Sequence, residues 1–209
     1  MSEALLFVLS EPGGVPEPTF HEWYDDEHGP ARLAVPGIRI GYRYRALDDA
    51  RPTWLAWYET DLETLAGARY RALREWRSPR EQRIVDGLDA LDRRVYKLID
   101  DHGRIPGPAP VVVCTSFSTP DEDALHAWYL DEHIPMLQAI PGWWRTRRYR
   151  IVSGTGPTLL AFHELSGTHL FDTDAYRAAV STIPRSTALS AVTARERRVF
   201  GYHNTIRSA

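Results

Sequence analysis

The sequence predicts an α+β protein built from two consecutive copies of one unit. Three observations carry this prediction. Residues 21–37 (HEWYDDEHGPARLAVPG) return at residues 126–142 (HAWYLDEHIPMLQAIPG), so that residue 21 maps to residue 126, a shift of 105. The same shift joins RYR at 43–45 to RYR at 148–150. Runs with strand and helix periodicity also follow in the same order around both copies, and we therefore expect two units of roughly 100 residues each.

The first unit begins with a strand and a helix. Residues 4–9 (ALLFVL) form a short apolar run, which is typical of a buried strand, and the Pro- and Gly-rich stretch 11–18 supplies the turn after it. Thr19 is the predicted cap of the following helix. Because a proline removes one helical hydrogen bond, Pro30 predicts a kink or an early end near Asp26.

A hairpin, a helical region and a last strand complete the first unit. In residues 38–47 (IRIGYRYRAL) tyrosines and arginines alternate, as in a strand with unlike faces, and the aromatic-rich run 53–59 pairs with it across a turn. Helical spacing returns at 61–76, and a second helical piece is expected at 79–88. Residues 90–99 read as the closing strand. The predicted order is strand, helix, strand, strand, helix, strand.

The second unit repeats this order after a linker. Residues 102–110 (HGRIPGPAP) have the proline and glycine content of a linker, so the predicted domains are residues 1–101 and residues 111–209. A strand comes first, followed by a helix that opens at Thr119 and Pro120. The later segments that match the first unit are 143–152, 157–164, 172–193 and 197–203. The last helical region is shorter and more broken than its counterpart, which indicates that the two pockets differ.

Composition narrows the classes of partner. The chain has 209 residues, 43% of them hydrophobic, and a formal net charge of -3. The sequence shows no basic stripe that would follow phosphates, so nucleic acid is not an expected partner. No apolar run approaches the roughly 20 residues that span a bilayer, and no targeting segment is recognisable. The single cysteine, Cys114, suits a buried thiol in a reducing compartment. We expect a cytoplasmic protein that binds neither membrane nor nucleic acid.

The repeated segment supplies the candidate catalytic residues. At about 100° per residue, a helix places His21, Tyr24 and His28 on one side and Trp23 towards the other. Histidine titrates near neutrality and tyrosine can donate a hydrogen bond to a developing oxyanion, so the two suit acid/base chemistry. The predicted catalytic residues are His28, His133, Tyr24 and Tyr129. The predicted substrate-binding residues are His21, His126, Trp23, Trp128, Tyr44, Tyr58, Tyr149 and His163, the last four provided that their strands face the helix.

Structural roles compete with these assignments. A single histidine on a helix is more often a surface residue or a hydrogen-bonded core residue, which applies above all to His21 and His126. Trp23 and Trp128 are typical core anchors. Glu27 is typical of a solvated charge near a helix start.

A pocket without metal or cofactor is the expected kind of site. The two histidines of each repeated segment are seven residues apart, which corresponds to about 10 Å along a helix and is too far for one shared ion. The sequence has no HExxH, cysteine pair, glycine-rich phosphate loop or nucleophile elbow. This argues against zinc hydrolases, nucleotide-using enzymes and serine hydrolases.

The repeated motif resembles a known superfamily. WYDDEHGP at 23–30 and WYLDEHIP at 128–135, each followed by PG and an aromatic strand with arginines, are similar to the dimeric α/β-barrel superfamily and, within it, to the EthD-like proteins. The resemblance implies two ferredoxin-like βαββαβ repeats that form an α/β barrel with the helices outside and a pocket between each sheet and its helices. His28 and His133 match the motif histidine. Members of the superfamily include cofactor-free monooxygenases, polyketide cyclases, decarboxylases, muconolactone-type isomerases, and haem-using peroxidases and monooxygenases.

The predicted function is that of a cofactor-independent enzyme of the lyase, cyclase or isomerase type, using His/Tyr acid/base chemistry on an oxygenated, aromatic or enolisable metabolite. Two alternatives stay open: a haem-dependent or cofactor-free monooxygenase or peroxidase, and a ligand-binding barrel without catalysis. If only one unit is active, the first is expected to be degenerate, because Asp25 and Gly29 depart from the more apolar second copy. The duplication allows a monomeric pseudo-dimer, and exposed sheet edges would allow a homodimer.

Overall fold

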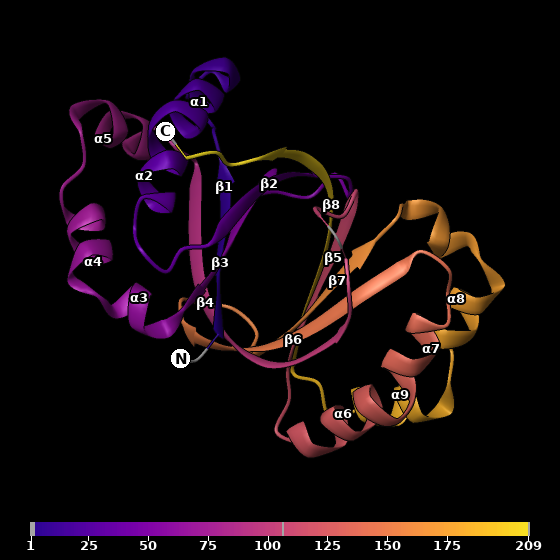
Figure 1. Ribbon diagram of the computed structural model, residues 1–209. Helices are drawn as coiled ribbons and strands as arrows, with labels where there is room; N and C mark the ends of the chain where they lie inside the picture. Colours follow the sequence, from indigo (N-terminus) through magenta and orange to yellow (C-terminus); the bar gives the residue numbers. More distant parts are fainter. Residues whose placement is uncertain (1–2, 106, 209) are drawn as a thin grey trace. The chain divides into compact units, whose positions relative to one another are not determined.

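The computed structural model describes residues 3–105 and 107–208, and residues 1, 2, 106 and 209 lie outside this description. The first repeat has the predicted order of elements, with its helical segments divided into shorter pieces (Figure 1). Its elements are β1 (Glu3–Glu11), α1 (Glu17–Trp23), the π-helical turn η1 (Tyr24–His28), α2 (Gly29–Leu33), β2 (Ile40–Ala46), β3 (Trp54–Asp61), α3 (Leu62–Ala66), α4 (Ala68–Glu75), α5 (Pro79–Asp86) and β4 (Ala90–Gly103).

The second repeat has the same order of elements. They are β5 (Val111–Ser118), α6 (Glu122–Trp128), the π-helical turn η2 (Tyr129–His133), α7 (Ile134–Gln138), β6 (Trp143–Ser153), β7 (Leu159–Leu165), the 3-10 helix η3 (Thr168–Asp172), α8 (Asp174–Ala179), α9 (Ile183–Leu189) and β8 (Ala194–Thr205). Both repeats place a π turn just before the repeated proline, so the duplication extends to this local irregularity.

Strand pairing gives each repeat a ferredoxin-like sheet. In the first repeat β1 lies between β3 and β4, and β2 pairs with the other edge of β3, all antiparallel. In the second repeat β5 lies between β7 and β8, and β6 pairs with β7, again antiparallel. The hydrogen-bonded order of the eight strands, β1-β3-β2-β8-β5-β7-β6-β4, closes as a barrel. The predicted fold class, α+β with two βαββαβ repeats in an α/β barrel, is confirmed.

Contacts divide the chain into two compact units. The first comprises Met1–Leu98, Val152–Thr155 and Tyr202–Ala209, and the second comprises Ile99–Ile151 and Gly156–Gly201. Each unit therefore includes the end of the other repeat's last strand. The predicted domains, residues 1–101 and 111–209, and the linker at 102–110 stay predictions; Pro106 of that linker lies outside the described residues.

The repeated segment stays helical through its proline. Pro30 has no N–H, so a regular helix would leave the carbonyl of Asp26 without a donor. Instead the Gly29 N–H donates to the carbonyl of Tyr24, five residues back, and the chain continues through η1 and α2 to Leu33. The helix does not end near Asp26, because the π turn takes up the irregularity.

Two predicted helix starts differ from the structure. α1 begins at Glu17 instead of after a Thr19 cap, and Pro18 lies in its first turn, where a missing N–H is tolerated. In the second repeat Asp121, and not Thr119, caps α6 with its side chain. Both differences shift a helix boundary by two or three residues and leave the order of elements unchanged.

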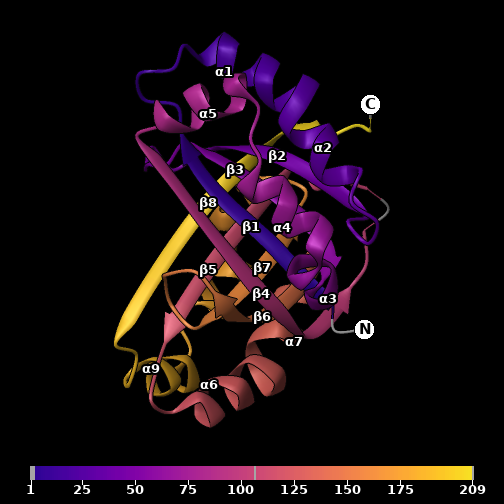
Figure 2. The same cartoon turned by 90° about the vertical axis from the view of Figure 1, so that its left-hand side faces the viewer.

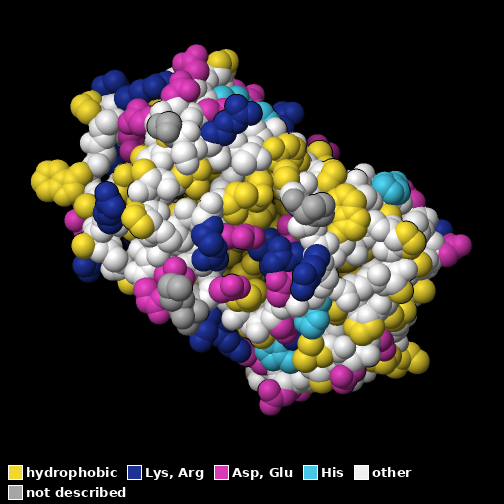
Figure 3. All heavy atoms as spheres, viewed as in Figure 1, with side chains coloured by type: hydrophobic (Ala, Val, Ile, Leu, Met, Phe, Trp, Pro, Cys, Tyr) yellow, Lys and Arg dark blue, Asp and Glu magenta, His cyan; other side chains and the backbone are white. Residues whose placement is uncertain are grey.

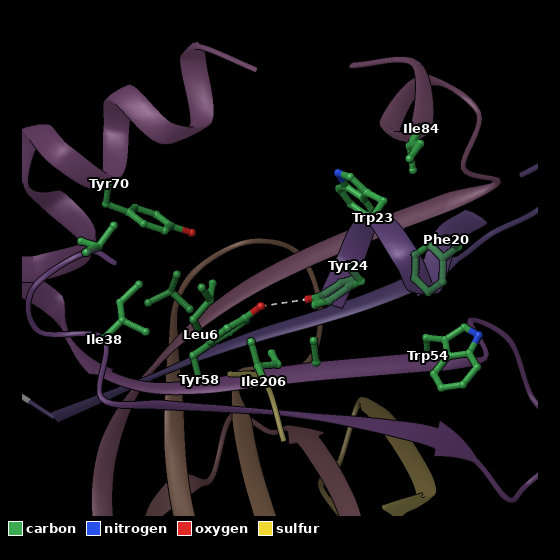
Figure 4. Packing of buried hydrophobic residues seen from close by; sticks show 13 residues of the cluster. Leu6, Phe20, Trp23, Tyr24, Ile38, Trp54, Tyr58, Tyr70, Ile84 and Ile206 are labelled. Carbon is green, nitrogen blue, oxygen red and sulfur yellow. Dashed lines mark hydrogen bonds between the residues drawn. The ribbon is translucent and has the colours of Figure 1, made fainter. Parts of the chain in front are cut away.

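The core of the first unit lies between its helices and its sheet. Figure 2 shows α1 to α5 lying over one face of β1, β3 and β4. The large buried side chains of this layer are Phe20, Trp23 and Tyr24 from the helices and Trp54 and Tyr58 from β3 (Figure 4). Burying a large apolar side chain contributes about 1.5–3 kcal/mol, so this layer fixes the repeated segment on the sheet. Two further clusters take the same role in the second unit.

The surface is mixed in charge. Positive and negative side chains are interspersed over the face seen in Figure 3. Within residues 3–105 and 107–208, no helix combines the length and the apolar character needed to cross a membrane.

Replacing Gly37 by alanine is expected to destabilise the fold. Gly37 follows α2 with φ +100°, and a Cβ there would lie 2.0 Å from Oγ1 of Thr64. We expect Gly37→Ala to lower the free energy of unfolding by about 1–3 kcal/mol, measured by urea denaturation. Gly14→Ala is the matched control, since its Cβ would meet only the carbonyl of Gly87 at 3.9 Å. Equal stability of the two variants would contradict the assignment of strain to Gly37.

Candidate functional site

The π turn brings His28 against two aromatic rings of its own helix. The centroid of the His28 ring lies 4.3 Å from that of Trp23 and 4.8 Å from that of Tyr24. The helical wheel predicted Trp23 on the other side from His28, but a π turn sets residues five apart almost one above the other. The predicted separation is therefore wrong, and Trp23 and His28 are neighbours. The His28 side chain is 12% exposed.

A carboxylate and a guanidinium complete the surroundings of His28. Its Nδ1 lies 2.9 Å from Oε1 of Glu81, a buried residue in the first turn of α5. Arg32 donates from Nη2 to the same oxygen at 3.3 Å and from Nη1 to the His28 carbonyl at 3.1 Å. Side chains from η1, α2 and α5 thus form one network.

The repeated glutamate ties α5 to the π turn. Ser78 caps α5 by accepting a hydrogen bond from the Glu81 N–H at 3.0 Å, and its hydroxyl donates to Oε1 of Glu27. The sequence pattern predicted a solvated charge at Glu27, and the structure instead gives it this bond. The contact sets Glu81 opposite His28.

Burial and charge determine the protonation of the pair at neutral pH. Burial, followed by the charge of Arg32, lowers the pKa of His28 to about 3 despite the hydrogen bond to Glu81. Burial alone would raise the pKa of Glu81, but the bond from His28 and the charge of Arg32 outweigh it, and that pKa lies below its ordinary value. An ionised carboxylate only accepts hydrogen bonds. Neutral His28 therefore carries its proton on Nδ1, and Nε2 keeps a lone pair.

Two tyrosine hydroxyls meet close to His28. The Tyr24 and Tyr58 oxygens are 3.0 Å apart, and Figure 4 shows them facing each other below Trp23 in that view. Burial raises the pKa of Tyr24, and it raises that of Tyr58 further, so both phenols stay protonated. The Tyr58 ring lies over Gly41, where a Cβ would come within 2.5 Å of it. The glycine therefore makes room for the tyrosine.

A cavity of about 230 Å³ opens beside His28. Tyr58 and Glu81 line it together with His28, and so do four arginines: Arg32, Arg74, Arg77 and Arg93. Glu81 is the single carboxylate among the described residues of the lining. Because guanidinium groups outnumber it, the cavity favours an anionic or electron-rich oxygen.

His133 keeps the aromatic neighbours of His28 but not its carboxylate. Its ring centroid lies 4.3 Å from that of Trp128 and 5.4 Å from that of Tyr129. Among the described residues its Nδ1 has no hydrogen-bond partner, and burial lowers its pKa to about 4. His163, which matches Tyr58 in the repeat, is paired through Nδ1 with Oγ1 of Thr146 at 2.9 Å, and burial lowers its pKa to about 3. The cavity here is about 50 Å³.

One changed position accounts for the missing carboxylate. Thr182 caps α9 as Ser78 caps α5, each by accepting a hydrogen bond from the N–H three residues further on. That third residue is Glu81 in the first repeat and Arg185 in the second. The carboxylate that would face His133 is thus replaced by a guanidinium.

Two predicted histidines belong to a different part of each unit. His21 accepts a hydrogen bond at Nδ1 from Arg43 at 2.8 Å, and His126 accepts one from Arg148 at 3.0 Å. Neither lines the cavity of its motif partner. His21 and His126 are therefore not brought together with His28 and His133.

Tyr44 and Tyr149 also lie away from these cavities. Neighbouring residues of a strand point to opposite faces of the sheet. Arg43 faces the helices, because it donates to Asp25 at 2.9 Å and lies 4.3 Å from the ring centre of Tyr24. Its neighbour Tyr44 therefore points to the other face, and the prediction that Tyr44 lines the helix-facing site is wrong. Tyr149 instead lines a smaller cavity, of about 10 Å³, together with His126 and Tyr129.

Three residues near the tyrosines and His28 were not predicted from the sequence: Arg32, Arg43 and Glu81. Glu81 stands in the pattern Ser-x-x-Glu, which is typical of a helix start, so the helix that begins here could be predicted. The pattern does not reveal which histidine the carboxylate meets. Arg43 belongs to the repeated RYR motif. The repetition could have indicated that Arg43 and Arg148 have the same role, which is to donate a hydrogen bond to His21 and His126.

Haem, which the resemblance left open, does not fit these cavities. Pockets that enclose a drug-sized ligand measure about 300–1,000 Å³, and a porphyrin is larger than most such ligands. The cavities beside His28 and His133 measure about 230 and about 50 Å³. Each histidine ring is also packed against a tryptophan, which obstructs the approach of a flat macrocycle.

Comparisons with known proteins support the fold. No protein-family model matches the chain, and no curated protein matches it. Similar solved structures include an anthrone oxidase-like protein, with 14% identity and a TM-score of 0.66 over 100% of this chain and 93% of that one. A regulator of staphylococcal pathogenesis has 14% identity and a TM-score of 0.54 over 96% and 99% of the two chains. A monooxygenase-like protein from Listeria innocua has 10% identity and a TM-score of 0.51 over 97% and 95%. At these identities the likeness establishes the fold alone.

The buried histidines are expected to make stability depend on pH. The pKa values of His28, His133 and His163 lie at about 3, about 4 and about 3, below the ordinary value of 6.5. Between 6.5 and these values the unfolded chain binds protons that the folded chain does not, so the free energy of unfolding falls as the pH falls. Each histidine adds a slope of at most about 1.4 kcal/mol per pH unit.

Urea unfolding between about pH 7 and pH 5 measures this slope. We expect His163→Gln to give a flatter slope than the wild type, whatever its effect on absolute stability. The exposed His169 supplies the control variant His169→Gln, which should keep the wild-type slope. A wild-type slope in His163→Gln would contradict the burial argument.

Haem addition is expected to leave the protein without a bound chromophore. Titrating the purified protein with hemin and recording the absorption spectrum should show no saturable shift of the Soret band, because the cavities are too small. A saturable shift that disappears in His28→Ala or His133→Ala would show that the protein holds haem after all.

Proposed function

We propose that this protein of the dimeric α/β-barrel fold is an enzyme whose first unit moves a proton on a small oxygenated metabolite, with His28 as the base. The observation that carries the proposal is the 2.9 Å contact between His28 Nδ1 and the buried Glu81. A carboxylate that orients an imidazole and stabilises its charged form is a recurrent arrangement in general-base catalysis. The proposal assigns activity to the unit that Asp25 and Gly29 had marked as degenerate.

The proton transfer uses the free side of the imidazole. Nδ1–H of His28 donates to Glu81, so Nε2 accepts a proton from the bound substrate. Glu81 stabilises the imidazolium that forms, and arginines of the cavity stabilise the enolate or phenolate oxygen left on the substrate. The enolate or phenolate that forms beside the ring raises the pKa of the imidazolium above the value of His28 in the empty site. The ion pair that the transfer creates therefore favours the transfer.

The lining of the cavity supports an enolisable or phenolic substrate. Leu6, Val8 and Val85 supply apolar contacts for a ring or an acyl chain, and Tyr58 supplies a hydroxyl that can donate to an oxygen. Lyases, cyclases and isomerases that act on such compounds begin by removing a weakly acidic proton. These three classes are the first candidates for the reaction.

Cofactor-free oxygenation is the second candidate. It is favoured by the likeness of the fold to an anthrone oxidase-like protein and a monooxygenase-like protein. An enolate or phenolate is also the electron-rich species that can reduce dioxygen, so both candidates share the first step. An oxygen electrode separates them, because only oxygenation consumes dioxygen during turnover.

Replacing either member of the pair is expected to stop proton transfer. Exchange of substrate hydrogen for deuterium in deuterium oxide, followed by NMR over a panel of phenols and β-dicarbonyl compounds, measures this step directly. We expect His28→Gln and Glu81→Gln to slow the exchange by at least about 100-fold. His28→Gln removes the base, and Glu81→Gln removes the carboxylate that keeps the proton of His28 on Nδ1. His133→Gln is the matched control in the second unit and should exchange at the wild-type rate.

Two outcomes would refute the assignment. One is wild-type exchange by His28→Gln on a compound that the wild type deuterates. The other is an equal loss of exchange in His133→Gln, which would move the site to the second unit or make the effect structural. Circular dichroism of each variant confirms that it is folded.

A further inference from the structure

We propose that the cavity of the second unit binds a small oxoanion that carries a hydroxyl group, of the kind represented by hydrogenphosphate and hydrogencarbonate. This site lies outside the function proposed for the first unit and does not depend on it. Its cavity of about 50 Å³ is lined by His133, His163, Tyr176 and arginines. Such a volume holds about four water molecules, which is room for an anion of four or five heavy atoms.

Three guanidinium groups of the described chain face this cavity together. Arg185, Arg195 and Arg197 line it, and within residues 3–105 and 107–208 none of them has a carboxylate partner. The guanidinium carbons of Arg195 and Arg197 lie 5.7 and 5.2 Å from the ring centres of Phe117 and Phe171, which hold them in place. Burial, and then the charge of Arg195, lower the pKa of Arg185, as expected for like charges in proximity. A bound anion relieves this repulsion.

The free nitrogen of His133 selects a ligand with a hydroxyl group. His133 is 7% exposed, and in the described part of the chain its Nδ1 has no hydrogen-bond partner. A hydrogen bond with the backbone of Ala179 favours the protonated ring, as donation from Nε2 to a carbonyl does. The neutral ring therefore presents a lone pair at Nδ1. A hydroxyl group can donate to this lone pair while the charged oxygens of the same ligand meet the arginines.

The equivalent cavity of the first unit lacks these features at two matched positions. Counted from the helix cap, Arg185 stands where the first repeat has Glu81. Counted from RRV at 93–95 and 197–199, Arg195 stands where the first repeat has Leu91. Both changes add positive charge beside the motif histidine. The second unit thus replaces the carboxylate that makes His28 a base with groups that hold an anion.

Isothermal titration calorimetry with inorganic phosphate tests the site at about pH 5.5, where phosphate is mainly a monoanion. Nitrate is the probe that has the same single charge and lacks a hydroxyl group. At constant ionic strength we expect saturable phosphate binding and weaker nitrate binding. Arg185→Gln should weaken phosphate binding at least about tenfold, because a charge-assisted hydrogen bond is lost. Arg177→Gln is the matched control, since Arg177 pairs with Asp174 on α8 and does not line the cavity.

Two further variants separate charge from shape and one unit from the other. Arg185→Lys keeps the charge and should retain more phosphate binding than Arg185→Gln. His133→Leu should weaken phosphate binding and leave nitrate binding unchanged. His28→Gln, altered in the first unit, should bind phosphate as the wild type does, so the test is independent of the catalytic proposal.

Three results would overturn the inference. No saturable phosphate binding by the wild type would remove the site. Unchanged phosphate affinity in Arg185→Gln would place any binding elsewhere on the chain. Equal affinity for nitrate and phosphate would indicate a general ionic effect and contradict the role given to the His133 nitrogen.

Discussion

The hydrogen bond from the Gly29 N–H to the Tyr24 carbonyl is the constraint on which the rest of the site depends. Pro30 cannot donate a hydrogen bond, and a regular helix would have to break or bend at this point. The π turn keeps the helix continuous and places the His28 ring against the rings of Trp23 and Tyr24. The same bond forms in η2, so both units carry a buried histidine in the same aromatic frame.

The two units have the same π turn and aromatic rings around the motif histidine, but their sites differ. The contacts that support the turn are repeated, whereas the residues that face the histidine are not. In each repeat the motif glutamate accepts a hydrogen bond from the hydroxyl that caps a distant helix, α5 in the first repeat and α9 in the second. Beyond the cap, the first repeat presents Glu81 and the second presents Arg185. Arg32 is likewise matched by Leu137 under the shift of the repeat. Duplication therefore preserves the scaffold, while the ion pair of Glu81 and Arg32 beside His28 gives way to the Arg185 guanidinium in the second unit.

The order of elements was predictable because the spacing of hydrophobic residues shows which side of each helix or strand is buried. The duplication was predictable because the two copies keep a constant shift in the sequence. The site was predictable only in part. His28 was assigned from its motif, but Trp23 was assigned to the wrong side because an ideal helix does not contain a π turn. Tyr44 was misplaced because alternation tells which residues share a face and not which face meets the helices. Glu81 lies 53 residues from His28 in the chain, and a single sequence does not reveal which helices meet.

NMR titration of the imidazole nitrogens tests the central claim most directly, because it reports the charge and the tautomer of His28 in the folded protein. From about pH 8 to pH 4 we predict that His28 stays neutral, with its proton on Nδ1 and a bare Nε2, and that Glu81→Gln changes this tautomer signal. A pKa near 6.5 would contradict the burial of His28, which is the main cause of its low pKa. A proton on Nε2 in the wild type would contradict the pairing with Glu81 and remove the basis for a catalytic base in the first unit.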